Sequence, residues 1–287
     1  MNKYYKVFFV LLLSIFSFYY TNKTIDFIRE ADPIMKEIKH NRYKFDKKSI
    51  NASVGDFYMI PGINGVLVDT KKSYSKMKRY GKYNENLLVF KEEEPDISLD
   101  DIYDRFIIGG NGENRKVALV FIIRRDDKID HLLDILSQED VKATFFMDGL
   151  FIENNQDLVK NLTKSAFEVE LLSYNGRYQK KYFKYGIDLL KDITNIRPKY
   201  CYASYSSEYI LDLCNSLSMH TIIPNINPSN RAYQVVKRKL VSGSIISLKN
   251  KDYILEELTT IISYIKQKGY DIVNLNDLLS EKRFEEE

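Results

Sequence analysis

The fold of this chain is decided by KVALVF at Lys116–Phe121 and VKATFF at Val141–Phe146. Both segments are rich in β-branched and aromatic residues, as buried strands are, and each carries a lysine at or near its start. A segment with helical character lies between them. This order predicts a strand–helix–strand unit of a parallel α/β domain.

The same alternation continues to the C-terminal end. Strands are predicted at 117–123, 142–147, 167–172, 199–202, 221–223, 244–248 and 271–274. The clearest helix lies between the last two, where Ile254, Leu258 and Ile265 share one face and Gly269 ends it. This pattern fits an incomplete (β/α) barrel or a doubly wound sheet, and the pattern alone does not choose between them.

The N-terminus has the character of an export signal or a membrane anchor. Two lysines precede the apolar run Val7–Tyr20, and residues 21–23 do not provide the small residues of a cleavage site. The run is shorter than the ~20 residues that cross a bilayer, but it approaches that length when Tyr4 and Tyr5 are included. We predict an uncleaved, single-pass anchor with an extracytoplasmic body; a cleaved signal with a secreted body is the alternative.

The segment between the anchor and the main domain carries no motif for chemistry. Residues 21–45 have helical spacing that Pro33 interrupts, which predicts a stalk or docking helix. A small α+β segment is predicted next, with strands at 57–60, 66–68 and 86–90, a tight turn at 62–65 and a polar helix at 71–80. Residues 91–101 are predicted to be a solvated linker.

Composition is that of an ordinary globular protein. The chain has 43 basic and 40 acidic residues, a net charge of +3, and no run of like charge long enough to bind nucleic acid. Cys201 and Cys214 are not spaced as a metal-binding pair. We expect two small core residues, with a disulfide as the alternative that an extracytoplasmic location would permit.

Residues 115–280 resemble the polysaccharide deacetylase (NodB-homology) family. The resemblance rests on short motifs in the family's order: Lys116–Leu119 with Phe121, Leu132–Leu136, Val141–Phe146 with Gly149, Arg197 and Pro198 with Tyr200, Gly243–Ile246 with Leu248, and Lys268–Tyr270. It implies an α/β fold, a distorted seven-stranded (β/α) barrel. The expected division is then an anchor at 1–22, a stalk helix with the small α+β segment at 23–110, and a deacetylase-like domain at 111–287.

The positions that carry the family's chemistry hold other residues here. The family ends its first strand with T-F-D-D, a general base and a metal ligand, where this chain has Ile122 and Ile123. Leu172 and Gly176 replace the two metal-binding histidines of its H-x-x-x-H motif. The family's L-H-D motif, which carries the general-acid histidine, reads Leu248-Lys249-Asn250 here, so Lys249 replaces that histidine.

Hydrolysis of this kind needs a metal to activate water. Ile, Leu and Gly side chains offer a divalent ion no lone pair, so no cofactor is expected. A displaced site for zinc or another divalent metal, built from Asp127, His131 and Asp148, is the alternative. We expect residues 126–130 instead to cap a helix that begins near Ile129.

The strand ends still predict a binding cleft. Its candidate residues are Tyr174, Asn175, Arg197, Tyr200, Tyr202, Lys249 and Asn250. Arg197 is the position that orients the base in the family. Aromatic rings stack on sugars while amide and cationic groups bond hydroxyls; the alternative is ordinary surface tyrosine in a chain with 22 Tyr and no Trp.

Three functions follow from these observations. The first is a membrane-tethered, deacetylase-like protein without hydrolytic activity that binds cell-envelope polysaccharide or peptidoglycan, or scaffolds protein partners. The second is an active metal-dependent N-deacetylase with the displaced site. The third is a protein-interaction module in which residues 21–110 recognise the partner.

Overall fold

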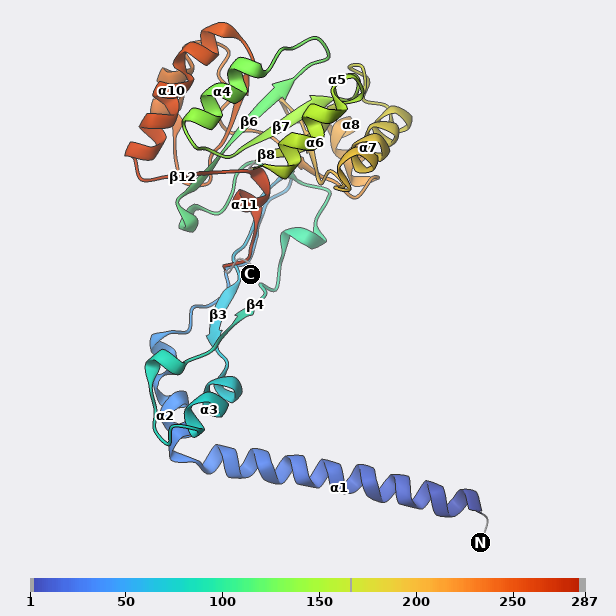
Figure 1. The fold of residues 1–287 in the computed structure, drawn as a ribbon, viewed down its shortest axis with the longest axis vertical. Coiled ribbons are helices and arrows are strands. Elements are labelled where there is room, and N and C mark those ends of the chain that lie inside the picture. The colour runs from blue at the N-terminus through green and yellow to red at the C-terminus, as the bar shows by residue number, and fades with distance from the viewer. Residues whose placement is uncertain (1–2, 166, 284–287) are drawn as a thin grey trace. The chain divides into compact units, whose positions relative to one another are not determined.

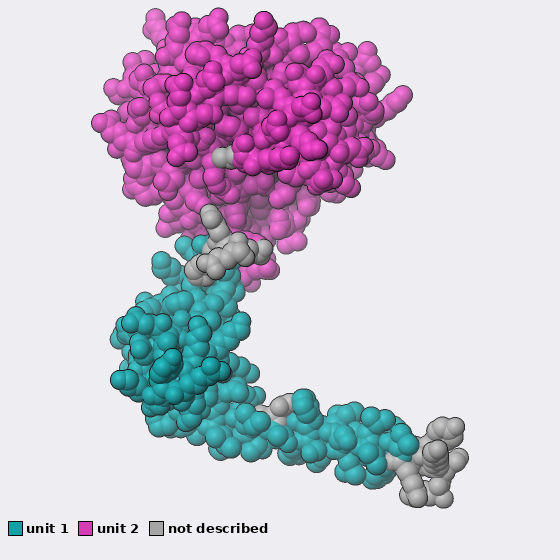
Figure 2. Space-filling model, in the orientation of Figure 1, with its two compact units in different colours: residues 1–49, 64–93, 283–287 teal, residues 50–63, 94–282 magenta. Residues whose placement is uncertain are grey.

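The computed structural model describes residues 3–165 and 167–283, which form two compact units (Figures 1 and 2). Within those residues, one unit consists of 3–49, 64–93 and 283, and the other of 50–63 and 94–282. This differs from the boundary expected at residue 110. Segments 50–63 and 94–110 belong to the larger unit because they supply strands to one of its sheets.

The first unit begins with two helices. The helix α1 spans Lys3–Ala31, and α2 spans Pro33–Asn41. The break between them lies at Pro33, as predicted, and the Asp32 side chain caps α2 by accepting the backbone N–H of Ile34 at 2.9 Å.

A short hairpin and a third helix complete this unit. Its other elements are η1 (Arg42–Lys44), β3 (Gly65–Val68), α3 (Thr70–Lys78), η2 (Glu85–Leu87) and β4 (Phe90–Glu93). The strands β3 and β4 pair antiparallel, and Ile34, Ile38 and Met77 form a small core beneath them with Val68 and Leu88. The strand expected at 86–90 begins only at Phe90, because the preceding residues form a 3-10 turn.

The predicted hairpin between residues 57–60 and 66–68 does not form. Strand β2 (Tyr58–Ile60) pairs instead with β1 (Ser53–Val54), and it belongs to the larger unit whereas β3 does not. Gly62 is needed for a close approach of two chain segments: a Cβ atom there would lie 2.3 Å from the carbonyl oxygen of Ile50.

All seven predicted strands of the main domain are present. They are β6 (Lys116–Ile123), β7 (Ala143–Asp148), β8 (Phe167–Ser173), β9 (Tyr200–Tyr202), β10 (His220–Ile222), β11 (Ile245–Lys249) and β12 (Asp271–Val273), joined by β5 (Phe106–Ile107) from the preceding segment. The helices are α4 (Asp130–Gln138), α5 (Gly149–Asn154), α6 (Gln156–Lys164), α7 (Lys180–Thr194), α8 (Glu208–Asn215), α9 (Ala232–Lys239), α10 (Asp252–Gln267) and α11 (Leu275–Leu279), with 3-10 turns η3 (Leu99–Asp101) and η4 (Gly112–Asn114).

The parallel strands are divided between two sheets. One has the order β11-β6-β7-β8, with β12 paired to the start of β6; the other has the order β1-β2-β5-β10-β9. An isolated parallel bridge pairs Ile246 of β11 with Ile226, four residues beyond the end of β10. The predicted α/β fold with parallel strands is therefore confirmed, but the strands form two separate sheets because no ladder among the described residues pairs β8 with β9.

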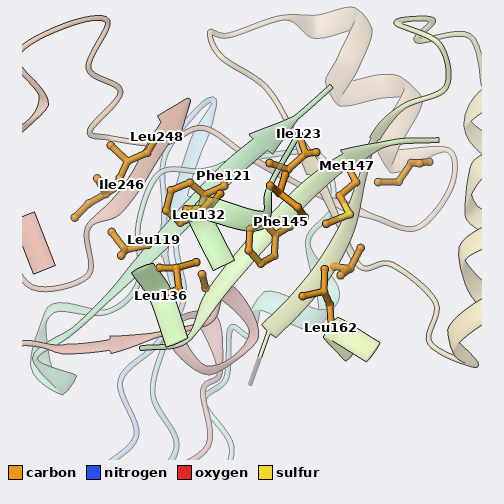
Figure 3. Close-up of a cluster of buried hydrophobic side chains, with 14 of the residues drawn as sticks. Leu119, Phe121, Ile123, Leu132, Leu136, Phe145, Met147, Leu162, Ile246 and Leu248 are labelled. Atoms are coloured by element: carbon orange, nitrogen blue, oxygen red, sulfur yellow. The ribbon is translucent and has the colours of Figure 1, made fainter. Parts of the chain in front are cut away.

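Alternate residues of each strand face two different cores. Residues such as Leu119, Phe121 and Phe145 face the surrounding helices and meet Leu132 and Leu136 of α4 (Figure 3). The residues between them, including Val120 and Phe146, pack inside, between the two sheets. This alternation fixes which side chains reach the carboxyl ends of the strands from inside.

Candidate functional site

The carboxyl ends of the parallel strands bring the predicted catalytic positions together. Ile122 lies at the end of β6, opposite Lys249 of β11 and Phe146 of β7 in the ladder. Ile122 packs on the inner apolar cluster, which also contains Leu172 of β8 and Tyr202 of β9. Two of the positions that hold catalytic groups in the resembling family, Ile122 and Leu172, thus pack in an apolar cluster.

The second isoleucine is more deeply buried. Ile123 has no exposed surface and belongs to the outer cluster that faces the helices. Gly176, the remaining ligand position, is an exposed turn glycine with φ of +66°. Within the described residues, no group of three or more His, Cys, Asp or Glu side chains is arranged to hold a metal ion. The side chains present at this site therefore do not fit the family's metal.

Asp148 is buried at the end of β7, and each oxygen of its carboxylate accepts two hydrogen bonds. It accepts the Ser173 hydroxyl at 2.7 Å and the backbone N–H groups of Leu150, Asn175 and Gly176, each at 3.0 Å. The left-handed backbone of Asn175 and Gly176 turns two successive N–H groups toward this anion. The loop that carries metal-binding histidines in the family here wraps a carboxylate.

The displaced site expected from Asp127, His131 and Asp148 is not assembled. The Asp127 carboxylate accepts the backbone N–H of Arg124 at 2.8 Å and closes the loop after β6. His131 is exposed on α4, whose N-cap residue Ile129 has no side-chain cap. The predicted capping role of residues 126–130 is also corrected, because Asp127 bonds back toward β6 rather than forward into the helix.

Two residues of the predicted cleft lie at the wrong end of their strand. Arg197 and Tyr200 precede or begin β9, whereas the cleft lies beyond its last residue, Tyr202. The Arg197 guanidinium donates to the Leu217 carbonyl at 2.5 Å, and the Tyr200 hydroxyl donates to Asn276 at 3.3 Å. The prediction placed Arg197 and Tyr200 at the carboxyl end of the strand, whereas they lie at its N-terminal end.

The Tyr174 side chain has another role than the predicted one, while Asn175 remains exposed. Tyr174 donates its hydroxyl to Glu153 at 2.8 Å, and its ring fills the space where a Cβ atom on Gly149 would stand 2.3 Å away. Burial and the adjacent Glu153 carboxylate raise the pKa of Tyr174. Asn175 is exposed in the two-residue turn between Tyr174 and Arg177.

Asn250 ties two of the strand-end loops together. Its amide nitrogen donates to the Lys128 carbonyl at 2.8 Å, while its Oδ1 atom is buried without a hydrogen-bond partner among the described residues. Asn250 is thus a buried residue that connects two loops, and not the exposed ligand-binding group that was predicted.

The remaining groups at these strand ends define what we call the mouth surface: the exposed Arg124, Tyr205 and Lys249, the half-buried Tyr178, and the buried Tyr202. Tyr205 is 69% exposed and Lys249 is exposed, while the Tyr202 hydroxyl is bonded to Ser247 at 3.0 Å. Burial raises the pKa of Tyr178, and the positive charge of nearby Arg124 opposes that rise. Across the described residues, neither Arg124 nor Lys249 forms a salt bridge.

Sequence reasoning missed Arg124, Tyr178 and Tyr205 as members of this surface. Arg124 directly follows β6, and Tyr205 follows β9 by three residues. The rule that ligands bind beyond the carboxyl ends of parallel strands could have identified both once the end of β9 was known. Tyr178 follows β8 by five residues and is brought close by the tight turn at Asn175 and Gly176.

The two cysteines are joined. Cys201 of β9 and Cys214 of α8 form a disulfide with their Cα atoms 6.3 Å apart. The expected pair of free core residues is therefore corrected, although both residues are buried in the outer core, as expected. The bond fastens α8 to β9 beneath the loop that carries Tyr205.

His220 is a structural residue. Its ring stacks on Tyr103 with centroids 4.3 Å apart, and its Nδ1 atom is 3.2 Å from the Ile102 carbonyl. Burial lowers its pKa.

Comparisons with known proteins agree with this geometry. The family model for polysaccharide deacetylase matches residues 109–220. Uncharacterized protein YlxY of Bacillus subtilis (strain 168) is 29% identical over 280 residues, which cover 91% of this chain and 88% of that protein.

Solved structures show the same fold. Wild-type BA3943 of Bacillus anthracis, a CE4 family pseudoenzyme, aligns with a TM-score of 0.67 and 26% identity over 88% of this chain and 97% of that one. A BA3943 mutant with restored enzymatic activity aligns with a TM-score of 0.67 and 25% identity over 88% and 100%.

Proposed function

Because this chain contains a polysaccharide deacetylase domain of the NodB-homology family, in a catalytically degenerate form, we propose that it binds cell-envelope glycan without hydrolysing it while tethered to a membrane. The observation that carries the proposal is the placement of Ile122 and Leu172 in the inner apolar cluster at the carboxyl ends of the strands. Metal ligands and a general base would have to stand there for hydrolysis.

The mouth surface supports binding. Tyr205 offers an accessible ring, and Lys249 and Arg124 offer cations that no carboxylate pairs among the described residues. An apolar sugar face can stack on the ring while hydroxyl or acidic groups bond to the cations. The rigid elements beneath, with the disulfide and the Asp148 loop, hold these groups in place.

The N-terminal helix supports tethering. Within α1, Val7–Ala31 is long and apolar enough to cross a membrane, and none of its described side chains is buried. A disulfide persists in an oxidising compartment, which favours a body outside the cytoplasm. Both features suit a protein that meets the glycan layer close to the membrane surface.

Binding is tested with the full chain in detergent, titrated with chitooligosaccharides and with soluble peptidoglycan fragments. Tyr205→Ala is expected to weaken the free energy of glycan binding by about 1 kcal/mol, which corresponds to a roughly five-fold higher Kd. Tyr43→Ala is the matched control, since Tyr43 is also 69% exposed but lies in the first unit. Absence of binding to both glycans, or equal losses in the two variants, would contradict the glycan assignment.

The lack of hydrolysis is tested separately. Acetate release from N-acetylated oligosaccharides is expected to stay at background, and metal analysis of protein purified without chelator is expected to show no stoichiometric ion. Turnover that a chelator abolishes would overturn this half of the proposal and leave the binding half standing.

A further inference from the structure

A pocket in the first unit is lined mainly by cations. It has a volume of about 430 Å³ and is bordered by Arg29 of α1, by Lys71, Lys72, Ser75 and Lys76 of α3, and by Val89. All of these residues belong to the same unit. The pocket is therefore defined within one compact body, where the end of the apolar helix meets the lysine-rich helix.

The charges around this pocket do not cancel. The helix α3, with sequence TKKSYSKMK, contains four lysines and no acidic residue. Asp26 pairs with Arg29 at 2.9 Å and with Lys71 at 3.8 Å. Asp69 is 3.9 Å from Lys72, and Lys76 forms no salt bridge within residues 3–165 and 167–283. Two carboxylates thus face four cations, which leaves the pocket positive.

The position of the pocket along α1 sets the depth at which it would meet a membrane. Arg29 lies nine residues beyond Tyr20, the end of the continuous apolar run. At a rise of 1.5 Å per residue this is roughly 14 Å of helix. The polar headgroup region adds about 5–7 Å beyond each side of the ~30 Å hydrocarbon core, and an apolar span of ~20 residues uses part of the helix after Tyr20. In a chain tethered through α1, Arg29 and the lysines that border the same pocket would then stand at the height of the headgroups.

We propose that this pocket binds a phosphate group, presented by an anionic lipid headgroup beside α1. Lysine ammonium groups are compact cations that bind phosphate as point charges, and Asp26 holds Arg29 and Lys71 toward the same space. Juxtamembrane lysines gain about 1 kcal/mol each near an anionic leaflet. The inference rests on the proposed membrane tether and is independent of glycan binding.

The test uses the full chain, reconstituted in nanodiscs of equimolar phosphatidylglycerol and phosphatidylcholine and then extracted into mild detergent. Native mass spectrometry measures the ratio of the two lipids that remain bound. Wild type is expected to retain phosphatidylglycerol preferentially, and Lys71→Ala with Lys76→Ala to lower that ratio about five-fold per lysine. The control removes two exposed lysines of the other unit, Lys160→Ala with Lys164→Ala, and is expected to leave the ratio unchanged.

Three outcomes would overturn the proposal. Equal retention of the two lipids would do so, as would an unchanged ratio in the α3 variant. Inorganic phosphate binding without any preference for phosphatidylglycerol would assign the pocket to free phosphate instead of a lipid. Release of the protein from membranes by alkaline carbonate would show that the tether itself has failed, which separates that failure from failure of the pocket.

Discussion

The carboxylate of Glu170 on β8 accepts the backbone N–H of Tyr200 on β9 at 2.9 Å. The same oxygen accepts the N–H of Lys199, also at 2.9 Å. Within the described residues, β8 and β9 lie in different sheets and share no ladder, so this side chain supplies hydrogen bonds that a neighbouring strand would otherwise provide. Glu170 therefore closes the seam between the sheets.

Glu170 is expected to make stability depend on pH. Burial raises its pKa well above the ordinary 4.5, and the neighbouring carboxylate of Glu168 raises it further. Between 4.5 and the raised value, the folded chain holds a proton that the unfolded chain has lost. The free energy of unfolding therefore falls as pH rises through this window.

Glu170→Gln keeps an acceptor oxygen for the two N–H groups but cannot ionise. We expect a flatter dependence of the free energy of unfolding on pH, measured by urea denaturation at several pH values above 4.5. Glu208→Gln, at an exposed position on α8, is the control and should leave the slope as in wild type. Equal slopes for wild type and Glu170→Gln would show that Glu170 does not carry the effect.

Asp148→Ala is expected to destabilise the domain by about 3 kcal/mol or more. The change leaves the Ser173 hydroxyl and three backbone N–H groups without their buried acceptor. It should also loosen the turn at Asn175 and Gly176 and so weaken glycan binding. Thermal unfolding and the glycan titration check the two effects, and a variant that matches wild type in both would refute the role given to Asp148.

Restoring the family's two aspartates is expected to have unequal effects. Ile123→Asp places a carboxylate among fully buried apolar side chains and should cost about 3 kcal/mol or more. Ile122→Asp is expected to cost less, because Ile122 is only partly buried and lies beside Lys249 in the ladder. Chemical denaturation of the two variants measures the difference, and the reverse order of stability would contradict the assignment of the two residues to separate cores.

Removal of the disulfide is expected to cost about 3 kcal/mol, the value for a loop of this length. The paired change of Cys201 and Cys214 to serine should therefore lower the Tm. Native protein from an oxidising compartment should show no free thiol before reduction. One reactive thiol per chain in unreduced protein would be incompatible with the bond.

The main domain could be predicted in detail because its signals are local. Each of the seven strands is a β-branched or aromatic run between breaks, and each forms within a residue or two of its predicted limits. The hairpin expected between 57–60 and 66–68 is replaced by two other pairings of β2, a local one with Ser53–Val54 and a distant one with Phe106–Ile107. The distant pairing leaves no mark in either segment.

The residues of the candidate site also fall into those that local sequence could place and those that it could not. Ile122, Leu172 and Gly176 could be placed from strand motifs that define their own register. Arg197 and Tyr200 were placed incorrectly because a short strand permits a shift that moves residues from one end of the sheet to the other. The role of Asp148 could not be predicted, because three of the four groups that donate to its carboxylate are backbone N–H groups. Almost any residue type can supply a backbone N–H, so the sequence does not show where such donors gather.

The amino-acid sequence by itself determined the parallel α/β frame and the loss of electron-pair donors at the metal positions, because apolar periodicity and side-chain chemistry are properties of single residues. Only the tertiary structure decided that Ile122, Ile123 and Leu172 pack in apolar clusters at their vacated positions, that Cys201 bonds Cys214, and that Glu170 closes the seam. Each of these depends on distances between segments that folding alone brings together.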